Sequence, residues 1–160
     1  MTGANPFDGL LSGDMDEWLA ALPEYQRQSI ADLLDDHDAV QVATIWLENS
    51  GPKDTAPFGG IRTAASNFYD NILKELQKAI CGGEEYASER RQLAEATKGG
   101  GKFLLVGALS TAIAPHVGAA AAVIGPAVAL TLGIVANAGK ATACDALEEL
   151  IDGRHPTSSS

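Results

Sequence analysis

The sequence predicts an all-α protein, a compact helical bundle with an apolar, Ala/Gly-rich helical hairpin in its C-terminal half. Apolar residues recur at helical spacing in several segments, and no segment alternates apolar and polar residues as a strand does. From Phe103 to Gly139 the chain has no Asp, Glu, Lys or Arg, and His116 is the only titratable residue there. At 160 residues the chain is long enough for one domain with a buried core.

The predicted domain spans residues 14–152, after a flexible arm at 1–13. Its first part, residues 14–50, reads as an acidic unit of three short helices. Ser12 or Asp14 caps the first, Pro23 suits the first turn of the second, and Asp36 or Asp38 caps the third. The apolar residues expected to face the core are Met15, Trp18, Leu19, Leu22, Ile30, Leu33, Leu34, Val42, Ile45 and Trp46, with Val40 as a further candidate.

The charge is concentrated in this acidic unit. Residues 1–50 contain ten acidic residues and one basic residue, Arg27, within a chain of net charge -10. Such a surface repels phosphate backbones, so we expect no nucleic-acid partner. Two interpretations stay open: the acids steer a basic partner, or they only keep the chain in solution.

The two cysteines, Cys81 and Cys144, form no metal or redox motif. Residues 1–13 lack the basic flank and apolar stretch of a signal peptide. The sequence therefore predicts two reduced thiols and a cytoplasmic location, with conditional association to a membrane.

The middle of the chain, residues 61–98, is predicted to form two amphipathic helices. Gly and Pro punctuate 51–60 as a linker, and a stripe at helical spacing then marks a helix over 61–80 that ends at Cys81-Gly82-Gly83. A charged helix is expected over 84–98, followed by a hinge at Gly99, Gly100 and Gly101. The stripe consists of Ile61, Ala65, Phe68, Ile72, Leu76 and Ile80.

The apolar hairpin is expected within residues 102–152, together with a terminal helix, and residues 153–160 read as a disordered tail. The first arm is Phe103–Ala114, the turn is 115–118, and the second arm is Gly118–Gly139. The first arm is about 18 Å long and too short to cross a bilayer, whereas the second reaches about 33 Å. Pro126 is expected to kink or split the second arm.

Two groups of hairpin residues are the candidate functional residues. Small residues recur every fourth position and form a ridge that lets another helix approach closely: Ala121, Gly125, Ala129 and Gly133. Phe103, Leu104 and Leu105 begin the first arm, and His116 lies at the expected tip, where a positive charge on its ring would oppose or permit insertion. The alternative is that His116 is an ordinary turn residue at the end of the bundle, without a function of its own.

Over residues 102–140 the chain resembles the α-helical pore-forming effectors of colicin type, in which amphipathic helices sheathe an apolar hairpin. The resemblance is one of pattern and covers about a quarter of the chain. It implies a membrane-acting effector that stays soluble until triggered, as in bacterial toxins and suicide or defence effectors. The alternative is a soluble interaction or oligomerisation module whose hairpin is a permanent protein interface. The expected partner is accordingly a lipid membrane, a protein, or a second copy of the chain.

The other motifs in the sequence are weaker evidence of function. Gly99-Gly100-Gly101-Lys102 lacks the first glycine and the Ser or Thr of a P-loop, which favours a hinge. The cluster Asp35-Asp36-His37-Asp38 has no second ligand set, so we expect a helix junction and no metal site. No catalytic pairing of Ser, His, Cys and Asp is visible. We therefore expect neither an enzyme nor a cofactor.

Overall fold

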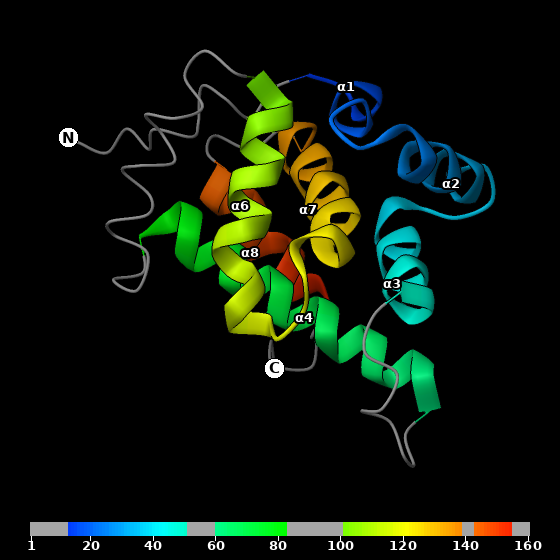
Figure 1. The fold of residues 1–160 in the computed structure, drawn as a ribbon. Coiled ribbons are helices and arrows are strands. Elements are labelled where there is room, and N and C mark those ends of the chain that lie inside the picture. Colours follow the sequence, from blue (N-terminus) through cyan, green and yellow to red (C-terminus); the bar gives the residue numbers. More distant parts are fainter. Residues whose placement is uncertain (1–12, 51–59, 83–100, 139–142, 155–160) are drawn as a thin grey trace.

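The computed structural model describes residues 13–50, 60–82, 101–138 and 143–154, and these contain seven helices and no strand. The prediction of an all-α bundle is confirmed. The helices, labelled in Figure 1, are α1 (Met15–Leu19), α2 (Glu24–Leu34), α3 (Ala39–Ser50), α4 (Gly60–Cys81), α6 (Gly101–Val117), α7 (Ala121–Ala136) and α8 (Ala143–Arg154).

The starts of α1 and α3 follow from side-chain caps. Asp14 caps α1, because its Oδ1 accepts a hydrogen bond of 3.0 Å from the N–H of Glu17. Asp38 and Gln41 form a reciprocal capping box at the start of α3: the Gln41 N–H donates to Asp38 Oδ1 at 2.8 Å, and the Asp38 N–H donates to Gln41 Oε1 at 3.1 Å. Pro23 occupies the N-cap of α2, one residue before the first turn expected for it.

The expected core faces of the first three helices are largely those observed. Trp18, Leu19, Leu22, Ile30 and Val42 are buried. Ile45 is only half-buried, and the buried positions of α3 beside Val42 are Ala43 and Leu47. The core side of α3 is therefore displaced from the predicted one, because α3 packs against both α4 and α7.

Helix α4 ends where the sequence predicts. Gly82 follows Cys81 at φ +119°, a conformation that favours glycine. Ile72, Leu76 and Ile80 of the predicted stripe are fully buried, and so are further α4 residues beside it: Tyr69, Leu73 and Ala79. The buried face is wider than a single stripe because α3, α6 and α8 all pack against α4.

Helix α7 is the centre of the bundle. It contacts every other described helix, and Figure 1 shows it between α6 and the α1–α3 segment, with α4 passing beneath. Its neighbour in sequence, α6, meets it at a bend of 118°. The two helices therefore form the predicted hairpin, with α7 inside.

The turn of the hairpin lies later than predicted. Helix α6 runs through Pro115 and His116 to Val117, and Gly118 closes it with φ +77°. The N–H groups of Gly118 and Ala119 both bond the carbonyl of Ala114, at 3.0 and 3.3 Å, which is how a helix ends at a left-handed glycine. Pro115 is tolerated because it lies near the end of the helix, where it removes one backbone hydrogen bond without breaking the helix.

The cysteine prediction is wrong. Cys81, the last residue of α4, and Cys144, in the first turn of α8, form a disulfide, with their Cα atoms 5.6 Å apart. The sequence separation of 63 residues conceals this proximity, because only the packing of α8 against α4 brings the two helix ends together.

Several predicted segments lie outside the described residues: the arm up to residue 12, the linker 51–59, the helix 84–98, Gly99 and Gly100 of the hinge, and residues 155–160. Gly101, the third hinge residue, is the first residue of α6. Helix α8 extends to Arg154, so Gly153 and Arg154 are helical and not part of a tail.

Candidate functional site

Helix α7 is enclosed on all sides along most of its length. Every residue from Ile124 to Gly133 is buried, and Val135 is buried as well. The helix has no charged residue, and apolar side chains lie all round it. A helix of this kind is stable in water only when other helices cover it completely, which is its position here.

The ridge of small residues on α7 is occupied by helices of the same chain. A Cβ atom built on Gly133 would lie 2.6 Å from Sδ of Met15 and 3.6 Å from Cβ of Trp18, so α1 sits directly on this glycine. A Cβ on Gly125 would lie 4.0 Å from Oγ of Ser110, which places α6 opposite. Ala129 is fully buried and Ala121 half-buried. The ridge therefore packs tightly against α1 at Gly133 and faces α6 more loosely at Gly125.

One polar pair ties the middle of α7 to α4. The Thr131 hydroxyl donates to the carbonyl of Ala127 at 2.7 Å, and its oxygen lies 2.8 Å from the Tyr69 hydroxyl. Since the single hydroxyl proton of Thr131 is used on Ala127, Tyr69 is the donor to Thr131. Both residues are fully buried, so this pair satisfies polar groups that would otherwise destabilise the core.

Pro126 does not split α7, and a side chain from another helix bonds the carbonyl that the proline leaves without a donor. Proline has no N–H, so the carbonyl of Ala122, four residues earlier, loses its helical donor. Gln26 of α2 donates to this carbonyl from Nε2 at 3.1 Å. Trp46 of α3 donates from Nε1 to the next carbonyl, of Val123, at 2.7 Å. The start of α7 is thereby attached to the acidic N-terminal helices.

Helix α6 is exposed at its beginning. Phe103 and Leu104 are 65% and 44% exposed, whereas Leu105 is buried. His116, in the last turn, is exposed, a position where a basic group complements the helix dipole. Of the four α6 residues singled out from the sequence, three therefore face solvent and one belongs to the core.

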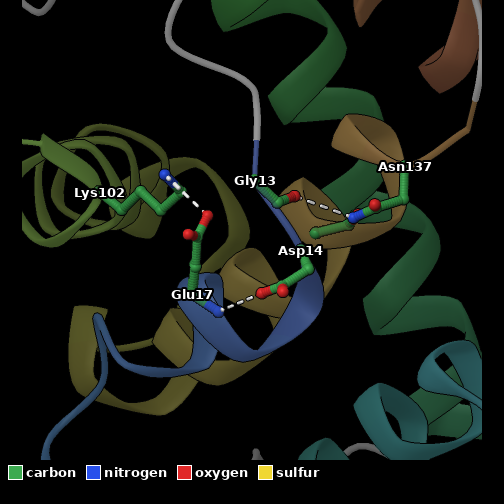
Figure 2. A network of polar contacts seen from close by, with 6 residues as sticks. Gly13, Asp14, Glu17, Lys102 and Asn137 are labelled. Carbon is green, nitrogen blue, oxygen red and sulfur yellow. Dashed lines mark hydrogen bonds and ion pairs between the residues drawn. The ribbon is translucent and has the colours of Figure 1, made fainter.

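The segment that carries α1 contacts both the start of α6 and the end of α7 (Figure 2). Nζ of Lys102 lies 3.6 Å from Oε1 of Glu17. The same atom lies 5.1 Å from the centre of the Trp18 ring. Asn137, which ends α7, donates from Nδ2 to the carbonyl of Gly13 at 3.0 Å. Lys102 in the first turn of α6 and Asn137, the C-cap of α7, are thus both held by the segment that carries α1.

Sequence reasoning missed the polar residues that position the hairpin. Signals for two of these contacts were present: Pro126 inside an apolar helix implies a carbonyl without a helical donor, and Thr131 is a polar residue in the middle of α7. Nothing in the sequence pointed to the donors Gln26, Trp46 and Tyr69, which come from other helices.

The described residues contain no single helix that is long and apolar enough to cross a membrane. The bent pair of Lys102–Val117 and Ala121–Ala136 meets the criteria of length and hydropathy only when its two helices are taken together. Within the same residues, no group of three His, Cys, Asp or Glu side chains is placed to hold a metal ion.

Comparison of the chain with protein-family models, with curated proteins and with solved structures finds no match.

Proposed function

We propose that the protein is a membrane-acting effector, pore-forming or membrane-disrupting, and that the bundle is its resting form. In this proposal the hairpin of α6 and α7 leaves the bundle and enters a bilayer after a trigger. The observation that carries the proposal is the position of α7: the charge-free helix at the centre of the bundle is covered by every other described helix.

The chemistry of α7 suits transfer into lipid. Its side chains carry no charge, and its one polar residue, Thr131, bonds a carbonyl of its own helix. Transfer of α7 therefore exposes no ionised side chain to hydrocarbon, and the Thr131 hydroxyl keeps a partner inside the helix, whereas the carbonyl of Ala122 gives up its bond to Gln26. The apolar surface that loses its protein neighbours is covered again by lipid, so the apolar burial lost on release is regained in the bilayer.

The contacts around the hairpin supply a restraint on release. The α1 segment holds Lys102 at the start of α6 and Asn137 at the end of α7. Behind α7, the disulfide between Cys81 and Cys144 attaches α8 to α4. Gln26 and Trp46 hold the start of α7. An effector of this kind needs such restraints, because it has to remain soluble until it meets its target.

The exposed side chains of Phe103 and Leu104 are suited to the first contact with a membrane. They precede the buried part of α6 and already face solvent in the resting form. Full burial of a Phe or Leu side chain is worth about 1.5–3 kcal/mol. Scaled by their exposed fractions, the two side chains contribute about 2 kcal/mol to lipid binding, or roughly a 30-fold change in partitioning.

The test is release of a self-quenching dye from phosphatidylcholine vesicles, with and without phosphatidylglycerol, at neutral and acidic pH. Phe103→Ser/Leu104→Ser is expected to reduce release strongly while the melting temperature stays at the wild-type value, because both side chains are exposed. Tyr25→Ser is the matched control, since Tyr25 is 67% exposed but belongs to α2. Absence of release by the wild-type protein in every condition, or an equal loss in both variants, would contradict the proposal.

The alternative function is a soluble module in which an apolar surface binds protein partners or copies of the chain. The exposed side chains of Phe103 and Leu104 on α6 favour this function too. The small ridge of α7 is covered by α1 at Gly133 and faces α6 at Gly125, so an interface between copies in the resting form would use Phe103 and Leu104 instead. Light scattering across a concentration series distinguishes the two functions. The module is favoured if the wild-type protein is an oligomer that causes no vesicle leakage and Phe103→Ser/Leu104→Ser is a monomer. The cytoplasmic location and the hinge at residues 99–101 stay predictions.

A further inference from the structure

A cavity lies beside the hairpin, where the corner between α1 and α2 faces α6 and the start of α7. Its volume is about 210 Å³. Val106, Gly107 and Ser110 of α6 line one side, and Gly125 of α7 lines another. Space remains there because two of these residues are glycines: a Cβ on Gly107 would meet no atom within 4 Å, and one on Gly125 would meet only Ser110 Oγ, at 4.0 Å.

The mouth of the cavity is aromatic. Tyr25 and Phe103 both line the cavity and are both about two-thirds exposed, at 67% and 65%. Residues that line a cavity and also face solvent lie at its entrance. No charged side chain is among the described residues that line the cavity.

The wall of the cavity contains a polar group without a partner. Ser110 is 2% exposed, and its Oγ makes no hydrogen bond in the described part of the chain. A buried hydroxyl is normally bonded, and a serine in a helix often bonds a carbonyl of its own preceding turn. The Oγ atom itself is almost closed to water in the resting form, so a molecule in the cavity completes its hydrogen bond only after rotation about the Ser110 Cα–Cβ bond.

We propose that this cavity is a binding site for a small neutral ring molecule that carries one hydrogen-bonding group, of the size and chemistry of a cresol or an indole. An enclosed apolar cavity of about 150 Å³ is known to bind benzene; this cavity is open to solvent on one side, and its 210 Å³ has room for a substituted ring. The uncharged lining selects against ions, the rings of Tyr25 and Phe103 flank the entrance, and Ser110 bonds the polar group. The site does not depend on release of the hairpin.

The experiment is calorimetric titration and NMR titration of the full-length oxidised protein with three probes: p-cresol, toluene and benzoate. p-Cresol and toluene differ by the one hydroxyl, so the Ser110 hydrogen bond is expected to make p-cresol bind roughly 3- to 10-fold more tightly. Benzoate is expected not to bind, because its charge finds no partner in the cavity.

Two variants test the assignment of residues. Ser110→Ala is expected to reduce the affinity for p-cresol to that for toluene and to leave toluene binding unchanged, with no loss of melting temperature because the hydroxyl has no protein partner. Gly107→Leu is expected to abolish binding of both probes by filling the cavity, in a variant that stays folded because its Cβ meets no neighbour.

The proposal is overturned if neither p-cresol nor toluene binds the folded protein, or if the two bind equally well. It is also overturned if Ser110→Ala weakens both probes to the same extent, because Ser110 then acts on the shape of the cavity and not as a hydrogen-bonding group. Unchanged binding by Gly107→Leu places the probes elsewhere and has the same consequence.

Discussion

Gln26 and Pro126 should be energetically coupled, because one compensates for the other. Pro126 leaves the carbonyl of Ala122 without its helical N–H, and Gln26 Nε2 bonds that carbonyl at 3.1 Å. Gln26 itself is buried, at 4% exposed. Gln26→Met retains the length of the side chain but leaves the carbonyl unpaired, which costs about 1–3 kcal/mol of unfolding free energy.

The same substitution should cost less when residue 126 has an N–H. In Pro126→Ala, the new N–H bonds the carbonyl of Ala122 within the helix, so loss of Gln26 Nε2 no longer leaves an unsatisfied group. We expect Gln26→Met to cost less than about 1 kcal/mol in this background, which gives a coupling energy of about 1–2 kcal/mol in the double-mutant cycle. Packing changes caused by each single substitution cancel in the cycle to the extent that they are independent.

The assay is urea unfolding of the four oxidised proteins, followed by tryptophan fluorescence and by circular dichroism to verify two-state behaviour. Trp46→Phe is the control. Trp46 bonds the carbonyl of Val123, whose helical partner is residue 127, an alanine with an N–H. Trp46→Phe should therefore add to Pro126→Ala without coupling. Additivity of Gln26→Met and Pro126→Ala within about 0.3 kcal/mol would refute the assigned role of Gln26.

Three further predictions concern the disulfide and the glycines. Replacing Cys81 and Cys144 by Ser opens a loop of sequence separation 63 and should lower the unfolding free energy in urea by about 4 kcal/mol. Under the proposed function, thiol reductant should speed vesicle leakage by the wild type but not by this double variant, and equal responses would argue against the disulfide as a restraint. Gly133→Leu should lower the unfolding free energy by about 1–3 kcal/mol, because the new side chain collides with Met15. Gly107→Leu, which has open space around it, should raise the unfolding free energy by about 1 kcal/mol through helix propensity. A higher melting temperature for Gly133→Leu than for Gly107→Leu would contradict the packing of α1 on α7.

Features that depend on neighbours within one or two turns were predictable from the sequence. The caps at Asp14 and Asp38 and the end of α4 before Gly82 all involve residues at most four apart. The sequence also predicted that other helices would enclose α7, because an uncharged helix in water requires cover on every side. The later turn at Gly118 was missed, because a proline near the end of a helix is weaker evidence of a boundary than a left-handed glycine.

The candidate site depends on residues that are far apart in the chain. Gln26 meets the carbonyl of Ala122 across 96 positions, and Cys81 meets Cys144 across 63. Helical periodicity says which face of a segment is buried but not which segment covers it. Whether a proline breaks a helix, whether two thiols form a bond and whether a buried serine has a partner are set by the packing of separate helices, since each answer depends on donors, acceptors and space that other segments provide.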